Sequence, residues 1–420
     1  MRSSYLSPKR VLKQSKASIS FGWERVNTST IYFIDDSTII TENLEPAKKI
    51  SINGQQNFAS GEEAKWKAAP ATNVVVENGV SIKSEVFNNF TKEYVGGSIQ
   101  IGKTNLTLKG NNEIYGGELW FSDDGASFNA ENATINLTGD NGLRVDSNAN
   151  VVLKGGTLNA NIRVYSNKGN ITLDGTTANV GKIFTSGAMG GMTAAEDFSL
   201  TLKNKTSLSL TDSSYANPSY SANSKFHGKI IVDGGSEIKS TNSKYVLFTP
   251  AEISVSGENS SMNLYAVVSK SEVSVDGGAE IVADIVKASD AFVGAGSTLT
   301  GKTSLTIENA LTVASDARIT SNSISFEKLT IAFTEDFSAN TDVSFNLETI
   351  FGENAGVVLS ALEGGAEFTV SGNNGEFSAS YEDINGGTIH IDTQVIPEPA
   401  TCAALFGGLA LTFALARRRK

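Results

Sequence analysis

The most constraining feature of this 420-residue chain is a short pattern that recurs between Lys49 and Ser315. It reads apolar, any residue, apolar, then a turn rich in Gly, Asn or Asp. The copies are I-S-I-N-G (50–54), V-V-V-E-N-G (74–79), L-T-L-K-G (106–110), I-N-L-T-G (135–139), V-V-L-K-G-G (151–156), I-T-L-D-G (171–175), L-T-L-K-N (200–204), I-I-V-D-G-G (230–235), I-S-V-S-G (253–257), V-S-V-D-G-G (273–278), A-F-V-G-A-G (291–296) and L-T-V-A-S-D (311–316). Units this short cannot bury an apolar face alone, so they must stack on their neighbours.

The spacing of the copies predicts a solenoid. The second apolar anchors Val232, Val255, Val275, Val293 and Val313 are separated by 23, 20, 18 and 20 residues, and Leu137, Leu153 and Leu173 by 16 and 20. V-D-G-G-S-E-I (232–238) and V-D-G-G-A-E-I (275–281) match at six of seven positions. A period near 20 with one strand and one turn per unit is typical of stacked repeats.

Alternation within each copy places Leu106 and Leu108 inside and Thr107 outside. The outward residues expected in one column are Thr107, Thr172, Thr201 and Thr312, together with Asn136, Val152, Ile231, Ser254, Ser274 and Phe292. A flat threonine array would resemble ice-binding solenoids, but the other residues interrupt it. The β-propensity of threonine explains these positions.

From residue 50 to about 330, the ladder resembles the right-handed parallel β-helix of autotransporter-like surface proteins. The resemblance implies an all-β solenoid body. An antiparallel sandwich is the alternative, because short strands and turns alone do not determine topology.

The pattern divides the chain into segments. Residues 49–325 form the repeat body, and residues 326–394 are expected to form a strand-rich cap, which includes the apolar run 343–351. A cap would protect the unpaired backbone groups at the end of the solenoid. Residues 1–48 are either a second cap or the product of a misassigned start, because they lack the apolar stretch of about 7–15 residues that a signal peptide needs.

Residues 395–420 have three ordered parts. Pro397, Glu398 and Pro399 come first and disfavour helix. Ala400–Ala416 is uncharged, and a helix of this length spans roughly 25 Å, enough for a bilayer core. The basic cluster Arg417, Arg418, Arg419 and Lys420 ends the chain and would stay on the cytoplasmic side.

This tail resembles the PEP-CTERM sorting signal of Gram-negative bacteria. The resemblance implies that an exosortase recognises Pro397–Pro399 in the inner membrane, cleaves nearby and passes the protein to the cell surface. An ordinary single-pass tail anchor, a transmembrane helix that is never cleaved, is the alternative.

Composition and charge limit the partners. The net charge is −11, so without the four basic tail residues the body carries −11 − 4 = −15. Such an acidic body argues against nucleic acid and anionic lipid as partners. Cys402 is the only cysteine, which excludes an intramolecular disulfide and a cysteine metal site.

Catalytic signatures are not found in the sequence. His227 and His390 are the only histidines, and neither belongs to a zinc or triad motif. Asp123 and Asp124 resemble a polygalacturonase carboxylate pair, but adjacent carboxylates project differently from the acid and base of glycoside hydrolysis. The sequence therefore predicts a turn at Asp123–Gly125 and no catalytic residue, metal or cofactor.

Two longer connections are candidate binding loops, 186–193 and 211–224, the latter with Tyr215 and Tyr220 able to stack on a sugar ring. The sequence thus predicts an exported structural or adhesive protein of an exopolysaccharide-rich envelope. The alternative is a secreted carbohydrate-active β-helix enzyme, a polysaccharide lyase or hydrolase.

Overall fold

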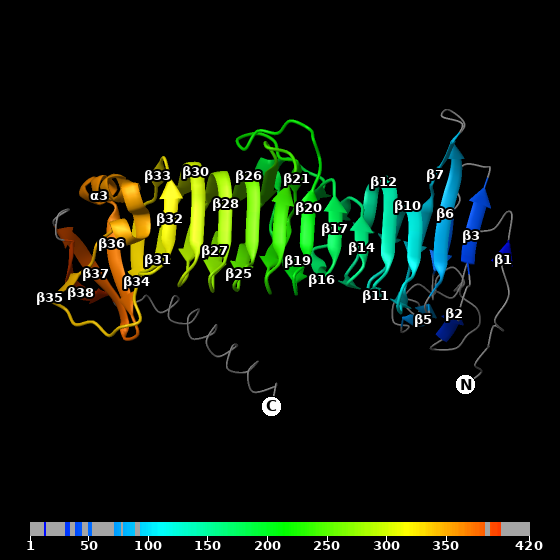
Figure 1. Cartoon of the computed structure of the whole chain (residues 1–420), viewed down its shortest axis with the longest axis horizontal. Helices are drawn as coiled ribbons and strands as arrows, with labels where there is room; N and C mark the ends of the chain where they lie inside the picture. The colour runs from blue at the N-terminus through cyan, green and yellow to red at the C-terminus, as the bar shows by residue number, and fades with distance from the viewer. Residues whose placement is uncertain are drawn as a thin grey trace, which may run out of the picture.

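The computed structural model describes residues 71–76, 79–88, 93–382 and 387–395, together with short strands at 12–13, 30–33, 38–43 and 49–52. It is an all-β rod whose body is a solenoid of about 11 turns (Figure 1). Successive turns pair in parallel, as between β11 and β13. The predicted all-β solenoid is confirmed, and the antiparallel sandwich is wrong for the body.

One face of the rod is formed by sheet B, which receives one strand from each turn. Its parallel strands are β2 (Thr30–Phe33), β5 (Thr72–Val76), β9 (Thr104–Leu108), β11 (Ser127–Glu131), β13 (Ala149–Lys154), β16 (Lys168–Asp174), β19 (Ala195–Lys203), β22 (Gly228–Val232), β25 (Ile253–Ser256), β27 (Glu272–Asp276), β29 (Asp290–Val293), β31 (Ala310–Ala314), β34 (Lys328–Ala332) and β36 (Glu367–Gly372).

Sheet A bends into two further faces, which we name A1 and A2 in chain order. Bent strands that contribute to both are β10 (Glu113–Phe121), β12 (Thr134–Val145), β26 (Ser261–Ser269), β28 (Glu280–Ala288) and β30 (Thr298–Ile307). Elsewhere separate strands supply A1 and A2 in turn: β14 (Thr157–Asn159) and β15 (Ile162–Val164), β17 (Thr177–Val180) and β18 (Ile183–Phe184), β20 (Ser207–Leu210) and β21 (Ser224–Lys225), β23 (Glu237–Ser240) and β24 (Val246–Thr249), β32 (Arg318–Ser321) and β33 (Ile324–Ser325). Each turn therefore carries three strand segments, where the sequence pattern predicted one.

The first turns follow the same path with one addition. On A1 lie β1 (Leu12–Lys13), β3 (Thr38–Asn43) and the start of β6 (Ser81–Asn88); β4 (Lys49–Ile52) and β8 (Ser98–Ile101) pair on A2. The end of β6 pairs with β7 (Glu93–Gly96) in an antiparallel hairpin. Residues 49–52 thus lie on sheet A, and not in the ladder that holds most other copies of the pattern.

The register confirms the predicted column of anchors. Val232, Val255, Val275, Val293 and Val313 are consecutive partners in sheet B. Leu153 and Leu173 belong to the same column, but Leu137 does not, because it pairs with Gly116 in sheet A. The sheet B strand of that turn is β11, where Ala130 pairs with Leu153. The A1 segment 135–139 has the same alternation as a sheet B strand, so the pattern alone could not separate them.

The predicted outward column of sheet B also holds except for one residue. Thr107 is joined by register to Asn129, Val152, Thr172 and Thr201, and further along by Thr312. Asn136 lies on A1 instead. The threonines do share a column, and five other residue types interrupt it.

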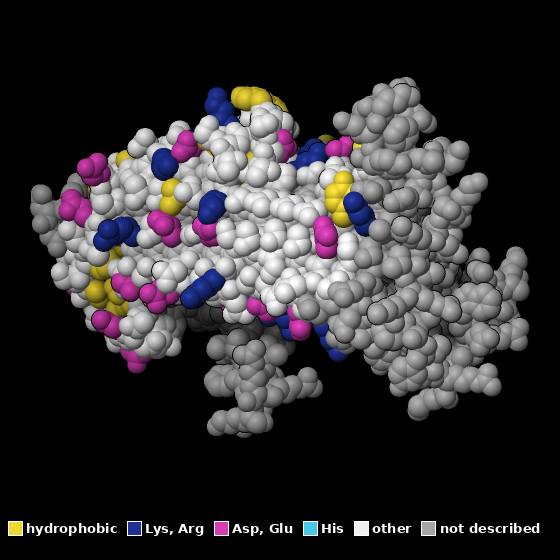
Figure 2. Space-filling view, turned by 45° about the vertical axis from the view of Figure 1, so that its right-hand side comes forward, with side chains coloured by type: hydrophobic (Ala, Val, Ile, Leu, Met, Phe, Trp, Pro, Cys, Tyr) yellow, Lys and Arg dark blue, Asp and Glu magenta, His cyan; other side chains and the backbone are white. Residues whose placement is uncertain are grey.

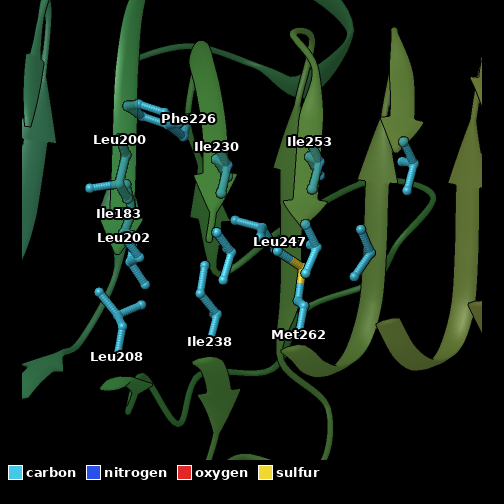
Figure 3. Packing of buried hydrophobic residues seen from close by; sticks show 14 of the residues in the cluster. Ile183, Leu200, Leu202, Leu208, Phe226, Ile230, Ile238, Leu247, Ile253 and Met262 are labelled. Atoms are coloured by element: carbon cyan, nitrogen blue, oxygen red, sulfur yellow. The ribbon is translucent and has the colours of Figure 1, made fainter. Parts of the chain in front are cut away.

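The core fills the space between the three faces. Leu200, Ile230 and Ile253 stack in register from sheet B, and Ile238 and Met262 stack on A1; all five are fully buried (Figure 3). Each turn repeats this arrangement, and alternate residues of every strand point inward. Burial of aliphatic side chains contributes about 1.5–3 kcal/mol each, so the column is the main source of stability.

The corner between sheet B and A1 is turned by glycine and closed by buried hydroxyls. Gly277 and Gly278 have φ of 65° and 81°, a left-handed conformation that explains the repeated Gly-Gly. The hydroxyl of Thr206 accepts a hydrogen bond from the Thr176 amide at 3.2 Å, and the Thr206 amide donates to the Ser236 hydroxyl at 3.1 Å. This ladder satisfies backbone amides that the corner removes from the sheets.

The C-terminal end changes from parallel to antiparallel pairing. After β36 the chain pairs through β37 (Gly375–Glu382) and β38 (Thr388–Val395) with β35 (Thr341–Ser344). Helices α2 (Glu348–Phe351) and α3 (Ala355–Glu363), joined by the short helix η2 (Gly352–Asn354), pack beside β32 and β33. The run 343–351 was expected to be a strand. This prediction is wrong for its second half, which is helical and buries Ile350 and Phe351.

Within the described ranges, no helix is long and apolar enough to cross a membrane. Pro397, Glu398, Pro399, the segment Ala400–Ala416 and the basic cluster Arg417–Lys420 lie outside the described residues.

Candidate functional site

On the face that Figure 2 shows, single acidic and basic side chains are scattered among backbone and uncharged polar side chains. Two polar arrangements depart from this background. Both lie where A1 meets A2, between the turns of β10 and β21. One is a ladder of amides on A1, and the other is a network of arginines and aromatic rings on A2.

The amide ladder consists of Asn136, Asn159 and Asn179, which are register partners on consecutive turns of A1. The Asn159 side-chain amide donates to the Asn136 Oδ1 at 2.6 Å, and the Asn179 amide donates to the Asn159 Oδ1 at 2.8 Å. The ladder lines a shallow groove of about 500 Å³ that runs from Tyr115 to Gly181. Its lining thus presents both hydrogen-bond donors and acceptors.

Glycines allow the backbones to approach closely beside the groove. A Cβ on Gly139 would lie 2.5 Å from the Gly117 carbonyl oxygen, and one on Gly142 would lie 2.2 Å from the Asn161 carbonyl oxygen. Gly142 also has φ of 54°. Larger residues at these positions would force the turns apart, so the bend between A1 and A2 depends on glycine.

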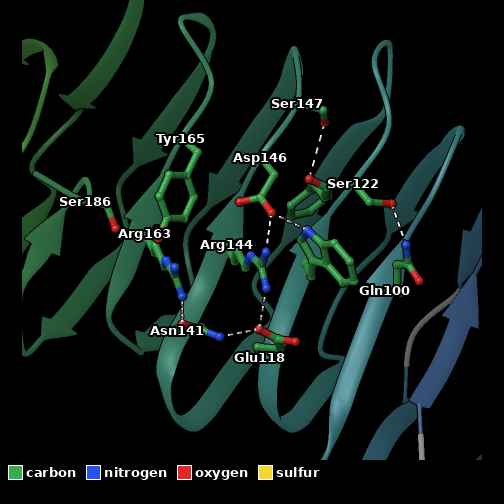
Figure 4. A network of polar contacts seen from close by, with 12 residues as sticks. Gln100, Glu118, Ser122, Asn141, Arg144, Asp146, Ser147, Arg163, Tyr165 and Ser186 are labelled. Atoms are coloured by element: carbon green, nitrogen blue, oxygen red, sulfur yellow. Dashed lines mark hydrogen bonds and ion pairs between the residues drawn. The ribbon is translucent and has the colours of Figure 1, made fainter. Parts of the chain in front are cut away.

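The network on A2 is centred on Arg144 (Figure 4). Its guanidinium lies 2.5 Å from the Asp146 carboxylate and 3.6 Å from that of Glu118. The Trp120 indole N–H donates to Asp146 at 2.9 Å, and the Asn141 amide donates to Glu118 at 2.8 Å. The hydrogen bond with Asp146 raises the pKa of Arg144, against the opposing effect of burial. Arg144 is therefore neutralised by two carboxylates.

Arg163 continues the column one turn further on, with different neighbours. Its guanidinium donates to the Asn141 Oδ1 and lies 4.4 Å from the Tyr165 ring centroid and 5.8 Å from that of Phe184. Within the described residues its Nε is buried without a hydrogen-bond partner. Lys182 also lies over the Phe184 ring, with its Nζ 4.9 Å from the ring centroid. Along A2 the network therefore changes from one arginine with two carboxylates to a group of cations and aromatic rings.

The structure places the two candidate loops on different corners. Loop 211–224 leaves the corner between A1 and A2, and its Tyr215 and Tyr220 are 74% and 82% exposed. Loop 186–193, which contains the short helix η1 (Met189–Gly191), leaves the corner between A2 and sheet B. Lys244 lies over Tyr215, its Nζ 5.6 Å from the ring centroid. The two loops therefore leave the rod at the two edges of A2.

Asp123 and Asp124 form part of a turn, as predicted. Asp123 accepts a hydrogen bond from the Ser122 hydroxyl at 3.0 Å, and Asp124 accepts one from the Asn148 backbone amide at 2.8 Å. Gly125 completes the turn with φ of 80°. The Asp124 carboxylate therefore holds the neighbouring turn, and the Asp123 carboxylate bonds within its own turn.

The two histidines lie far apart in the fold. His227 is buried between β21 and β22, where its Nε2 is 2.7 Å from the Ser166 carbonyl oxygen and its Nδ1 contacts the Thr185 hydroxyl. Burial lowers the pKa of His227, which favours the neutral ring. His390 lies in the cap, with Nδ1 2.6 Å from the Asp342 carboxylate. Across the described ranges, no group of three or more His, Cys, Asp or Glu side chains is placed to hold a metal ion.

Comparison with protein families, with curated proteins and with solved structures finds no match to this chain.

Sequence reasoning did not identify the amide ladder or the arginine network. A signal was present, because L-R-V-D (143–146) and I-R-V-Y (162–165) repeat the same polar alternation, and Asn136, Asn159 and Asn179 follow the period of the repeat. The ladder predicted from the sequence contains neither 143–146 nor 162–165, so it does not align the residues of A2 with one another.

Proposed function

We propose that this chain is an exported, non-enzymatic structural or adhesive protein of the cell surface or extracellular matrix. The observation that carries the proposal is the ordered tail, Pro397–Pro399, the uncharged stretch Ala400–Ala416 and the basic cluster Arg417–Lys420, next to a repetitive body. The tail is proposed to insert in the inner membrane as a transmembrane helix and to be the substrate of an exosortase. The solenoid of about 11 turns supports the proposal, since such a rod displays a long polar surface.

The finer details of the body are part of the same proposal. The solenoid is taken to be right-handed, because parallel strands connected within one sheet almost always cross over in that hand. The antiparallel strands β35, β37 and β38 are taken to cap the body and to separate it from the tail. Exopolysaccharide is the proposed surrounding, and nucleic acid is not a proposed partner of so acidic a body.

The test is mass spectrometry of the mature C-terminus in protein recovered from native cells. A C-terminal peptide that ends near Pro397–Pro399, without Ala400–Lys420, is expected. An intact C-terminus at Lys420 would remove the sorting proposal and leave a plain membrane anchor. Incubation of the purified protein with a panel of polysaccharides tests the non-enzymatic part, and chain shortening that is lost in Asp123→Asn/Asp124→Asn would contradict it.

A further inference from the structure

A strip of cations and rings on A2 has no acidic partner within the described part of the chain. We call it the cationic strip, and it comprises Arg163, Tyr165, Lys182, Phe184 and Lys225. Arg163, Phe184 and Lys225 are register partners on three consecutive turns. Since adjacent strands are about 4.8 Å apart, the two outer cations lie roughly 10 Å from each other along the rod.

Arg163 has unused hydrogen-bonding capacity. A guanidinium carries five N–H donors, and the Asn141 amide oxygen is its one hydrogen-bond partner within the described residues. The rings of Tyr165 and Phe184 hold the guanidinium in place by cation–π contact, and among the described residues no second acceptor is found for its donors. A partly buried cation in this state is expected to accept an anionic ligand.

Several other cations of the rod are paired with carboxylates. Arg144 is paired with Asp146, Lys229 lies 3.3 Å from Glu196, and Lys287 lies 2.9 Å from Glu308. By comparison, none of the ion pairs among the described residues includes Arg163, Lys182 or Lys225. Three unneutralised cations on neighbouring turns stand out in a body of net charge −15, calculated as −11 − 4 without the basic tail.

We infer that the cationic strip binds an acidic polysaccharide, a polymer of sugar rings that carry carboxylates. A guanidinium matches a carboxylate in a planar, two-point arrangement, and the lysines add point charges on the turns beside it. Aromatic rings such as Phe184 offer a flat apolar surface to one face of a pyranose ring. Because the binding groups repeat along the rod, the polymer lies parallel to its axis.

The groove on A1 adds contacts for the sugar hydroxyls. It ends at Gly181, which directly precedes Lys182 of the strip. Asn161 connects the two faces, since its side-chain oxygen accepts a hydrogen bond from the Lys182 backbone amide at 3.1 Å. A chain bound to the strip therefore has the amide ladder of Asn136, Asn159 and Asn179 beside it.

Single-stranded nucleic acid is the competing anion with flat rings. Its binding sites combine stacking rings with a positive groove that follows a phosphate on every nucleotide. The strip has three cations, and the remainder of the body is acidic and repels a polymer of high charge density. A polyuronate has more widely spaced charges, so it fits the strip better than single-stranded nucleic acid does.

This inference rests on the proposed extracellular function, because an acidic polysaccharide is met in that surrounding. The inference about the strip and the sorting proposal can be contradicted independently of each other. A protein that retains polyuronate but keeps Ala400–Lys420 in native cells would lose the sorting proposal alone. A protein that is processed at the tail but ignores polyuronate would lose the strip alone.

The test is affinity electrophoresis of the full-length chain in gels that contain polygalacturonate, dextran or neither, with a single-stranded DNA oligonucleotide as the rival probe in solution. Polygalacturonate is expected to retard the protein, increasingly so at low salt, and dextran is not. The variant Lys182→Gln/Lys225→Gln is expected to bind about tenfold more weakly. Arg163→Gln should weaken binding further if it folds, which its circular dichroism reports.

The matched control is Lys287→Gln. Lys287 lies in the same outward column of A2, three turns after Lys225, and is neutralised by Glu308. It is expected to bind polygalacturonate as the wild type does. Equal binding by wild type and Lys182→Gln/Lys225→Gln, no retardation by polygalacturonate, or tighter binding of the oligonucleotide would each overturn the inference.

Discussion

The guanidinium carbon of Arg144 lies 4.4 Å from the centroid of the Trp120 ring, and both side chains bind the same carboxylate oxygen, Oδ2 of Asp146. The pair joins β10 to β12 across A2 (Figure 4). The contact therefore adds to the sheet hydrogen bonds that hold these two turns of the solenoid together.

The first prediction concerns this contact. Arg144→Gln removes the ring contact and leaves Glu118 and Asp146 without their cation, so we expect a loss of about 2 kcal/mol in the free energy of unfolding. Urea unfolding followed by circular dichroism measures it. Arg318→Gln is the control, because Arg318 is exposed on β32, and its effect should stay within about 0.5 kcal/mol. Equal stability of the two variants would show that the network contributes nothing.

The second prediction concerns the hydroxyl ladder at the corner between sheet B and A1. Thr206→Val keeps the shape of the side chain but leaves the Thr176 amide without its acceptor, so we expect destabilisation by about 1–3 kcal/mol. Thr201→Val is the matched control. Thr201 lies on the outward side of β19, where valine has an equally good β-propensity, and its stability should change little. A neutral Thr206→Val would mean that water replaces the hydroxyl.

The third prediction concerns the glycine bend between A1 and A2. Gly142→Ala places a methyl group 2.2 Å from the Asn161 carbonyl oxygen at a φ of 54°, and we expect a loss of about 3 kcal/mol. Gly190→Ala in η1 has nothing within 4 Å of the new Cβ and should be tolerated. Thermal unfolding of both variants measures the difference. Equal melting temperatures would contradict the close approach of Gly142 to the Asn161 carbonyl oxygen.

The fourth prediction is a pH dependence. Burial lowers the pKa of His227 below its ordinary value of 6.5, so the unfolded chain binds more protons than the folded one as the pH falls below that value. The stabilisation is complete above pH 6.5 and is lost on acidification. We expect the free energy of unfolding to fall more steeply between pH 7.5 and 5 in the wild type than in His227→Asn. Parallel pH profiles would show that His227 titrates alike in both states.

Part of the fold could be predicted from alternation and spacing. Val275 and Val293 are neighbours in the column because their spacing equals one turn, and Gly277–Gly278 marks the corner because glycine alone adopts its left-handed backbone easily. Asp123–Gly125 was identified as a turn for a similar reason. These features depend on a few adjacent residues, so they are visible in the chain itself.

The candidate site could not be predicted in this way. Arg163 follows Asn141 by 22 residues, and their contact depends on the path of the chain through A2, sheet B and A1. The position of Leu137 on A1 shows the same limit, since its pattern equals that of a sheet B strand. Alternation states that one side of a strand is buried, and it does not state which face of the rod the strand joins.

The sequence by itself determined the all-β class and a repeat period near 20, since apolar alternation and glycine turns act within a few residues. The tertiary structure alone decided that the strands stack as a solenoid with three faces, that Arg144 meets two carboxylates and that Arg163 meets none in the described part of the chain. The physical reason is that charge neutralisation depends on distances between turns. Those distances are set by how the turns stack, and one turn of sequence does not contain them.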